Sequence, residues 1–286
     1  MTSDIKTYSG YRGVIGILTS THQTKEQVLR CMESCQGYPI WVHDNTNDTS
    51  HAERIHKAVE GKCHYFSTSF SNGTPGYGKN MLMKHFGMDS NLRFFDYCFQ
   101  IDSDDVWADT MPELFKRNYT ADFLMLSGDT IEWQGEMITT GKYDLTRKII
   151  DYLGDDYKKP DSPTKEMIDL QEMLSQFYRH PDNNFGTLNK VIGFHKGSYH
   201  KLKFKEDVRM GEDLLFMVDA IMMNKRKELN LQYLHDENLY VYKIQPTGMY
   251  MYNMTRPKTK YLATLRSHLP KRVPNNIHKH KVEWIK

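Results

Sequence analysis

The residues best suited to chemistry form an acidic cluster that directly follows a short apolar segment. Asp102, Asp104 and Asp105 lie within four residues, and the preceding Phe95–Ile101 is rich in aromatic and β-branched side chains. That composition predicts a buried strand that ends at the carboxylates. Neighbouring carboxylates repel one another unless a cation neutralises them, and Mg²⁺ or Mn²⁺ is the usual partner. An acidic turn or a helix cap explains the same spacing, so the cluster alone leaves both interpretations open.

A second acidic pair, Glu212 and Asp213, is predicted at the start of a helix. Leu214, Val218 and Met222 recur after it at helical spacing. Carboxylates at a helix N-terminus are stabilised by the helix dipole, which requires no function. In a cleft, the same position suits a general base that removes a proton from an attacking hydroxyl. The pair therefore needs a partner site before it indicates catalysis.

A glycine-rich segment, Ser71–Asn80, is predicted as a loop that leads into a helix over 81–86. Its glycines permit a ligand to approach the backbone closely, and Lys79 supplies a positive charge. The spacing is not that of a Walker-A phosphate loop, because the closing Lys-Ser/Thr pair is absent. As a phosphate cradle the segment is weak evidence by itself.

Strands and helices are predicted to alternate through the first hundred residues, which favours βαβ units and a parallel sheet. In such sheets ligands bind beyond the carboxyl ends of the strands. Thr19, Asp44 and Asp102 would all lie at those ends. The predicted strands are Gly13–Thr19, Pro39–His43, Cys63–Phe66 and Phe95–Ile101, and the predicted helices begin near Thr24 and span Glu53–Val59.

The later part of the chain continues the α/β pattern, with strands predicted at Asp122–Ser127 and at 239–244 and an extended segment over 184–194. We predict one domain over residues 1–255, interrupted by an insertion near 142–182. In that insertion Ser162 caps a helix with an apolar stripe. Residues 256–286 form a basic C-terminal extension.

The charge of the chain is distributed unevenly along its length. Of the 38 basic and 36 acidic side chains, nine basic and one acidic lie in residues 256–286, which leaves 29 basic and 35 acidic elsewhere. A basic tail on an acidic body suggests an anionic partner such as nucleic acid, a lipid surface or a phosphorylated substrate. A solubilising terminus, or one that packs through its interleaved aromatic residues, explains the same charges.

Whole-chain features favour a globular, cytoplasmic protein of a bacterium or a phage-infected host. The sequence is 39% hydrophobic and 26% charged, and it contains no apolar run long enough for a transmembrane segment and no signal-peptide core near Met1. The four cysteines, Cys31, Cys35, Cys63 and Cys98, fit neither a disulfide framework nor a zinc pattern. Reduced, buried thiols are expected.

Taken in order, these motifs resemble glycosyltransferase family 2, whose members are inverting enzymes. The resemblance covers roughly residues 12–250 and implies a GT-A fold, a Rossmann-like mixed sheet flanked by helices as in nucleotide-diphospho-sugar transferases. The matching stretches are Ile17–His22, Trp41–Asp44, Gly78–Asn80, Gln100–Asp105, Gly211–Asp213 and Tyr240–Tyr242.

The resemblance implies a role for each motif. Residues 102–105 are similar to the DXD motif, so Asp102 and Asp104 are implied as ligands of a Mn²⁺ or Mg²⁺ ion that bridges to the nucleotide diphosphate, with Asp105 as an alternate. Glu212-Asp213 is similar to the ED motif, in which the Asp is the expected catalytic base. The implied nucleotide-sugar contacts are Thr19, Asp44, Lys79, Asn80, Asp102 and Ser103.

The resemblance has departures, and it leaves the acceptor open. Thr19 and His22 replace the usual Pro and Asn of the first loop, and Asn45 replaces a second Asp. These changes fall in the nucleotide-contacting segments, and a UDP-sugar is the expected donor. The acceptor helix of processive synthases is absent, so a single transfer is expected. A hydroxylated base in phage DNA, bound through the basic extension, and a glycan or lipid-linked acceptor are both consistent with the charges. A nucleotidyltransferase and a non-catalytic sugar-nucleotide binder are the alternative classes.

Overall fold

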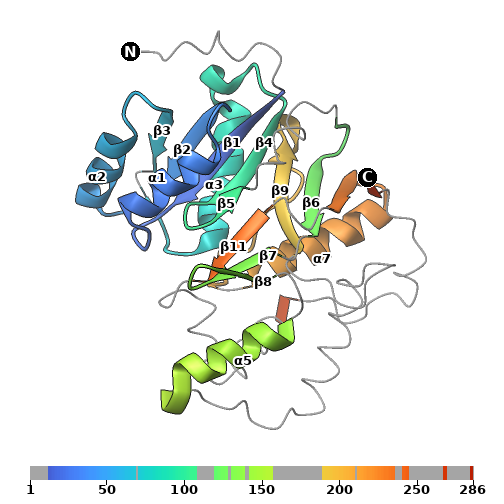
Figure 1. The fold of residues 1–286 in the computed structure, drawn as a ribbon. Helices are drawn as coiled ribbons and strands as arrows, with labels where there is room; N and C mark the ends of the chain where they lie inside the picture. The colour runs from blue at the N-terminus through green and yellow to red at the C-terminus, as the bar shows by residue number, and fades with distance from the viewer. Residues whose placement is uncertain are drawn as a thin grey trace.

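The computed structural model describes residues 12–68, 70–107, 119–127, 130–138, 142–156, 189–209, 211–235, 240–244, 267–268 and 284–285 (Figure 1). Two sheets and five α-helices account for most of these residues. Within the described residues, every helix is too short or too polar to cross a lipid bilayer.

The main sheet is mixed and has the strand order β12-β10-β6-β9-β4-β1-β2-β3. β9 runs antiparallel to both of its neighbours, β4 and β6, whereas β4, β1, β2 and β3 are parallel to one another. The strands of this sheet are β1 (Gly13–Thr19), β2 (Ile40–Asp44), β3 (His64–Ser67), β4 (Tyr97–Asp102), β6 (Phe123–Ser127), β9 (Asn189–His195), β10 (Leu231–His235) and β12 (Trp284–Ile285).

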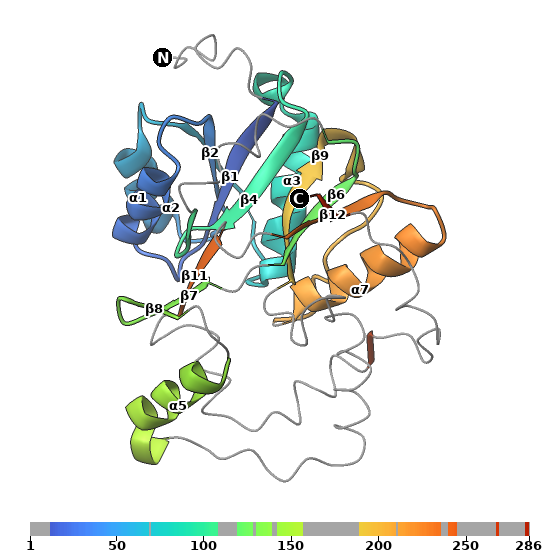
Figure 2. The ribbon, with the colours of Figure 1, turned by 45° about the vertical axis from the view of Figure 1, so that its right-hand side comes forward.

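Helices cover both faces of the main sheet (Figures 1 and 2). Alternate residues of β1 separate the two cores: Ile15 and Ile17 pack with α1 (Lys25–Ser34) and α2 (Thr49–Val59), while Val14 and Leu18 pack with α3 (Pro75–Met88) and α7 (Glu212–Lys225). All seven residues of β1 are buried, as expected for a strand with helices on both faces. The predicted α/β class, a mixed sheet flanked by helices, is confirmed.

Local signals explain where two of these helices begin. Thr24 and Gln27 form the predicted capping box at the start of α1. At α3 the prediction was wrong, because the helix starts at Pro75 and takes in the second half of the segment that was expected to be a loop. The Thr74 hydroxyl accepts a hydrogen bond from the Tyr77 backbone, and Pro75 occupies the first helical turn, where its missing N–H costs nothing.

A smaller sheet has the strand order β5-β11-β7-β8. Its members are β5 (Val106–Trp107), β11 (Tyr240–Ile244), β7 (Thr130–Trp133) and β8 (Glu136–Ile138). β5 follows the acidic cluster directly, so this sheet is continuous with the end of β4. β11 pairs antiparallel with β5 and parallel with β7, so the strand predicted at 239–244 belongs to the smaller sheet.

The predicted insertion and extension are described only in part. α5 (Lys142–Leu153) and a 3₁₀ turn (Gly154–Asp156) lie at the start of the insertion. The helix predicted after Ser162 lies outside the described residues. In the basic extension, β12 pairs in parallel with β10, so residues 284–285 form the edge of the main sheet.

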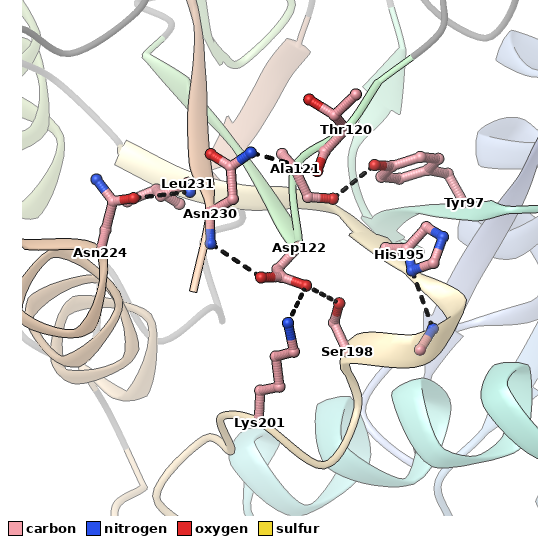
Figure 3. A network of polar contacts seen from close by, with 11 residues as sticks. Tyr97, Thr120, Ala121, Asp122, His195, Ser198, Lys201, Asn224, Asn230 and Leu231 are labelled. Carbon is pink, nitrogen blue, oxygen red and sulfur yellow. Dashed lines mark hydrogen bonds and ion pairs between the residues drawn. The ribbon is translucent and has the colours of Figure 1, made fainter. Parts of the chain in front are cut away.

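At the amino ends of β6 and β10, Asp122 joins three elements (Figure 3). Its Oδ1 accepts hydrogen bonds from Ser198 Oγ and Lys201 Nζ, both at 2.7 Å, and its Oδ2 accepts one from the Asn230 backbone N–H at 2.9 Å. These bonds tie β6 to β10 and to the 3₁₀ turn Lys196–Ser198. The network lies at the amino ends of these strands, whereas the acidic cluster follows the carboxyl end of β4.

Candidate functional site

The carboxyl ends of three adjacent strands bring several predicted site residues to one edge of the main sheet. Thr19 of β1 is in register with Asp44 of β2, and Leu18 of β1 is in register with Asp102 of β4. The Ser103 backbone N–H donates to the Leu18 carbonyl at 3.0 Å, which carries the pairing one residue past the strand. The parallel register therefore juxtaposes segments that are far apart in the sequence.

Lys79 links this edge to the second acidic pair. Its Nζ lies 2.7 Å from Glu212 Oε1 and 2.6 Å from Asp213 Oδ1, across more than 130 residues of sequence. The Lys79 side chain is 2% exposed and that of Glu212 is 9% exposed, whereas that of Asp213 is 32% exposed. Asp213 is thus the acidic residue of this pair that solvent or a ligand can reach.

The electrostatics of the cluster explain how Lys79 stays charged in a buried position. Burial alone would lower the pKa of its ammonium, but Asp213, Glu212 and Asp102 outweigh that effect and raise the pKa above its ordinary value. Burial also raises the pKa of the Glu212 carboxyl, against the opposing influence of Lys79. One ammonium therefore faces three carboxylates, and the site has an excess of negative charge that can attract a cation.

Asp44 has a different environment, on the face of the sheet that α1 and α2 cover. Tyr65 donates its phenol hydrogen to Asp44 Oδ2 at 3.0 Å. Burial raises the pKa of Asp44 to about 6, although the Tyr65 hydrogen bond opposes the shift. Three buried atoms here, Asp44 Oδ1, Thr19 Oγ1 and Ser103 Oγ, have no hydrogen-bond partner among the described residues. Such atoms require a bound water or a polar ligand.

The acidic turn is held by its neighbours on two sides. Arg30 of α1 donates to the Asp104 carbonyl at 3.2 Å, and Ser34 Oγ accepts from the Trp107 backbone N–H at 3.1 Å. On the other side, Asp105 Oδ1 accepts from the Lys243 backbone N–H of β11 at 2.9 Å. Asp105 is 1% exposed, whereas Asp102 and Asp104 are only partly buried.

The metal fit depends on what completes the coordination. Among the described residues, no group of three or more His, Cys, Asp or Glu side chains is arranged to hold a metal ion. Mg²⁺ and similar ions are commonly held by one or two carboxylates together with substrate phosphates and water. Asp102 and Asp104 match a site that the protein shares with its substrate: the two carboxylates supply two oxygen ligands, and the diphosphate and water supply the others.

Asn80 uses its side-chain amide within the protein. Its Nδ2 donates to the Phe204 carbonyl at 2.9 Å and to Glu206 Oε1 at 2.7 Å, and its Oδ1 accepts from the Phe204 backbone N–H at 2.8 Å. Two glycines of α3 near Asn80, Gly76 and Gly78, lie so close to neighbouring segments that a Cβ atom would not fit without a shift. A Cβ at Gly76 would lie 2.2 Å from the Lys205 carbonyl oxygen, so the start of α3 fits tightly against this segment. The predicted nucleotide contact through Asn80 remains a prediction.

Two residues of the site were not predicted from the sequence. Tyr65 has no motif around it, although alternation in its strand could have placed it on the Asp44 face. Glu206 lies in an irregular segment where no periodicity could indicate its contact with Asn80. The contact between Lys79 and Glu212-Asp213 was likewise not predicted, because nothing in the sequence pairs a helix start with another one so distant.

Comparisons with solved structures find similar folds at low identity. A 4-diphosphocytidyl-2C-methyl-D-erythritol synthase from Anaerococcus prevotii is 11% identical with a TM-score of 0.40, over 88% of this chain and 99% of that one. A protein from Desulfovibrio desulfuricans G20, provisionally named a nucleotide-diphospho-sugar transferase, is 12% identical with a TM-score of 0.35, over 90% and 96%. No family model and no curated protein matches the sequence.

Proposed function

We propose that this protein is an inverting glycosyltransferase that moves a sugar from a nucleoside-diphosphate sugar to an acceptor hydroxyl. The observation that carries the proposal is the bridge made by Lys79, which bonds Glu212 and Asp213 and is electrostatically coupled to Asp102. A donor-side acidic turn and an acceptor-side carboxylate at a helix N-terminus then both interact with Lys79. Direct displacement requires one of these groups to act on the donor while the other acts on the acceptor.

The reaction assigned to the site is a single displacement at the anomeric carbon. The acceptor oxygen forms a bond to that carbon while the bond from the carbon to the diphosphate oxygen breaks, and the nucleoside diphosphate leaves with the electron pair. Asp213 takes the hydroxyl proton of the acceptor, a role that suits the more exposed carboxylate of the pair. Lys79 holds Asp213 in place at the start of α7 through one ion pair, and it neutralises the buried Glu212 through another.

The donor half uses the other residues at the sheet edge. Asp44, Thr19 and Ser103 supply buried polar atoms that a nucleoside can satisfy. Asp102 and Asp104 would hold a Mn²⁺ or Mg²⁺ ion. When bound, that ion stabilises the negative charge that develops on the leaving diphosphate.

A nucleotide-sugar panel tests the proposal directly. The protein is incubated with Mn²⁺ and UDP-, GDP- or CDP-sugars, and the products are separated by chromatography. Slow release of free nucleoside diphosphate from one donor is the expected result, because water can replace the missing acceptor. Release of sugar 1-phosphate with transfer of the nucleotide would identify a nucleotidyltransferase. Binding without release of either product would identify a non-catalytic binder.

For the acceptor, we propose a hydroxylated base in DNA on the basis of the charge distribution. The nine basic side chains of residues 256–286 can contact backbone phosphates without reading sequence. Because β12 belongs to the main sheet, the test replaces Lys271, Arg272, Lys279 and Lys281 by Gln and leaves residues 284–285 intact. Duplex binding by the original protein should fall steeply with salt, and the variant should show a weaker salt dependence. Unchanged binding would favour a glycan or lipid-linked acceptor.

A further inference from the structure

Asp105 differs from the two carboxylates beside it in what its side chain contacts. It is 1% exposed, and its Oδ1 accepts a hydrogen bond from the Lys243 backbone N–H at 2.9 Å. Asp102 and Asp104 remain partly accessible at the tip of the turn. A carboxylate oxygen that is buried against a backbone donor is less available to a cation than one at the surface of the turn.

The hydrogen bond to Lys243 lies where the pairing between β5 and β11 stops. Val106 and Trp107 pair with β11 in an antiparallel register. At Asp105 the backbone leaves the sheet, because its own N–H donates to the Asp102 carbonyl at 3.0 Å and closes the turn. The side chain of Asp105 accepts a hydrogen bond from the Lys243 N–H. A carboxylate oxygen thus takes the place of the backbone carbonyl that would continue the β5–β11 pairing.

Lys243 extends this connection into the smaller sheet. It is in register with Glu132 of β7, and its ammonium forms an ion pair with the Glu132 carboxylate. The Lys243 side chain is 11% exposed, which makes the pair well shielded from solvent. Asp105 therefore connects the acidic turn to two strands of the smaller sheet, while Arg30 and Ser34 hold the turn from α1.

We propose that Asp105 is a positioning residue and not a metal ligand: its carboxylate anchors the acidic turn to β11, and the anchored turn presents Asp102 and Asp104 to the cation and the diphosphate. This assignment rests on the proposed function for the identity of the ligand. The anchor itself is a property of the ligand-free protein, so the two can fail separately.

Replacing Asp by Asn separates the two roles. Asn keeps a side-chain oxygen that can accept the Lys243 N–H but removes the negative charge that a hard cation requires. Asp105→Asn should therefore preserve the anchor, and Asp105→Ala should remove it. Asp104→Asn is the matched control, since it makes the same chemical change one residue away, at a carboxylate that is partly accessible.

Calorimetric titration of Mn²⁺ with UDP into each variant measures the ligand side. Asp104→Asn should weaken Mn²⁺-dependent UDP binding at least about tenfold, since the charge of the ligand set controls affinity. Asp105→Asn should stay within about threefold of the original protein, and Asp105→Ala should lose about tenfold, as expected when a group that orients ligands is removed. The apparent Mn²⁺ requirement of turnover should follow the same order. A loss in Asp105→Asn as large as in Asp104→Asn would overturn the proposal.

Hydrogen exchange without any ligand measures the anchor side. The Lys243 amide should exchange at least about tenfold faster in Asp105→Ala than in Asp105→Asn, because only the second variant retains an acceptor. Equal exchange in the two variants would overturn the anchor, whatever the protein binds. If the original protein binds none of UDP, GDP and CDP with Mn²⁺ while the exchange difference is present, the proposed function fails and the anchor stands.

Discussion

At the scale of single residues, the site depends on the order in which charges are buried at the start of α7. Lys79 and Glu212 are almost fully buried, and they flank Asp213, whose carboxylate is the most accessible of the three. A general base needs access to the acceptor and a fixed position, and these contacts supply both. In the proposed mechanism, Lys79 therefore contributes on the acceptor side through its ion pairs with Glu212 and Asp213.

Asp213→Asn should lower turnover by about 10²–10⁴-fold, the range associated with loss of a general base. Donor binding should change little, because the residue is assigned to the acceptor hydroxyl. Steady-state transfer and calorimetric donor binding check the two parts. Asp219→Asn, on the same helix, is the control, since its ion pair with Lys205 is half-exposed. Normal transfer by Asp213→Asn would contradict the assignment.

Lys79→Met should destabilise the protein by about 3–5 kcal/mol, because it leaves a buried carboxylate without its counter-charge. The control is Lys205→Met, which removes the partially exposed pair with Asp219 and should cost less than about 1 kcal/mol. Chemical denaturation of both variants gives the free energy of unfolding. Similar losses in the two variants would show that the Lys79 bridge contributes no more than a surface pair.

At the scale of elements, β2 and α3 meet through a cluster of neutral aromatic side chains. His43 of β2 is fully buried, and both of its ring nitrogens lack hydrogen-bond partners among the described residues. Its ring lies 5.6 Å from Trp41, 5.4 Å from Phe66 and 5.9 Å from His85, measured between centroids. Burial, together with the neighbouring His85, lowers the pKa of His43 to about 3. The cluster packs the elements that carry Asp44 and Lys79.

Acid should therefore weaken this packing. The pKa of His43 in the folded protein lies below its unfolded value, so the unfolded chain binds more protons between about pH 6.5 and 3 and stability falls as pH drops through that window. The cost reaches about 2 kcal/mol at pH 5, taking about 1.4 kcal/mol for each pH unit. The denaturation midpoint should therefore be lower at pH 5 than at pH 7, and His43→Phe should make the difference between the two midpoints smaller. The exposed His200→Phe is the control, and an unchanged difference in His43→Phe would sink the explanation.

At the scale of the whole molecule, the two ends of the strands in the main sheet carry different groups of residues. The carboxyl ends of β1, β2 and β4 collect Asp44, Asp102 and their partners, whereas the amino ends of β6 and β10 are tied by Asp122. Hydrogen bonds and the Lys201 ammonium lower the pKa of Asp122 although burial opposes them. The Asp122 bonds therefore join elements at one end of these strands, and Thr19 Oγ1, Asp44 Oδ1 and Ser103 Oγ, which have no hydrogen-bond partner among the described residues, lie at the other.

Asp122→Ala should cost about 1–3 kcal/mol of stability, because it leaves the buried Ser198 hydroxyl without its acceptor and removes the more exposed bonds from Lys201 and Asn230. Turnover at a temperature where the variant is folded should remain near that of the original protein, since the residue is at the far edge of the sheet. Thermal unfolding and the donor-hydrolysis rate check the two statements. A variant that is stable but inactive would place Asp122 in the chemistry and contradict this division.

Several parts of the fold were predictable because they depend on local patterns. Apolar runs of strand length indicated β1, β2 and β3, and the Thr24–Gln27 pair indicated the start of α1. The start of α3 was missed because glycines at close contacts look like loop glycines in a sequence. Gly76 and Gly78 lie against Lys205 and Asn45. Only the packed structure shows whether a glycine lies in a flexible loop or in a helix that is in close contact with a neighbouring segment.

By itself, the sequence determined that acidic groups would lie at the carboxyl ends of parallel strands, because strand direction follows from alternating apolar runs and helices. Tertiary structure alone decided which of those groups meet. The ion pairs of Lys79 with Glu212 and Asp213 join segments more than 130 residues apart, and Asp105 reaches the backbone of Lys243 in another sheet. Such contacts arise when a charge is buried and must find a partner, and that partner is chosen by packing, on which sequence spacing carries no information.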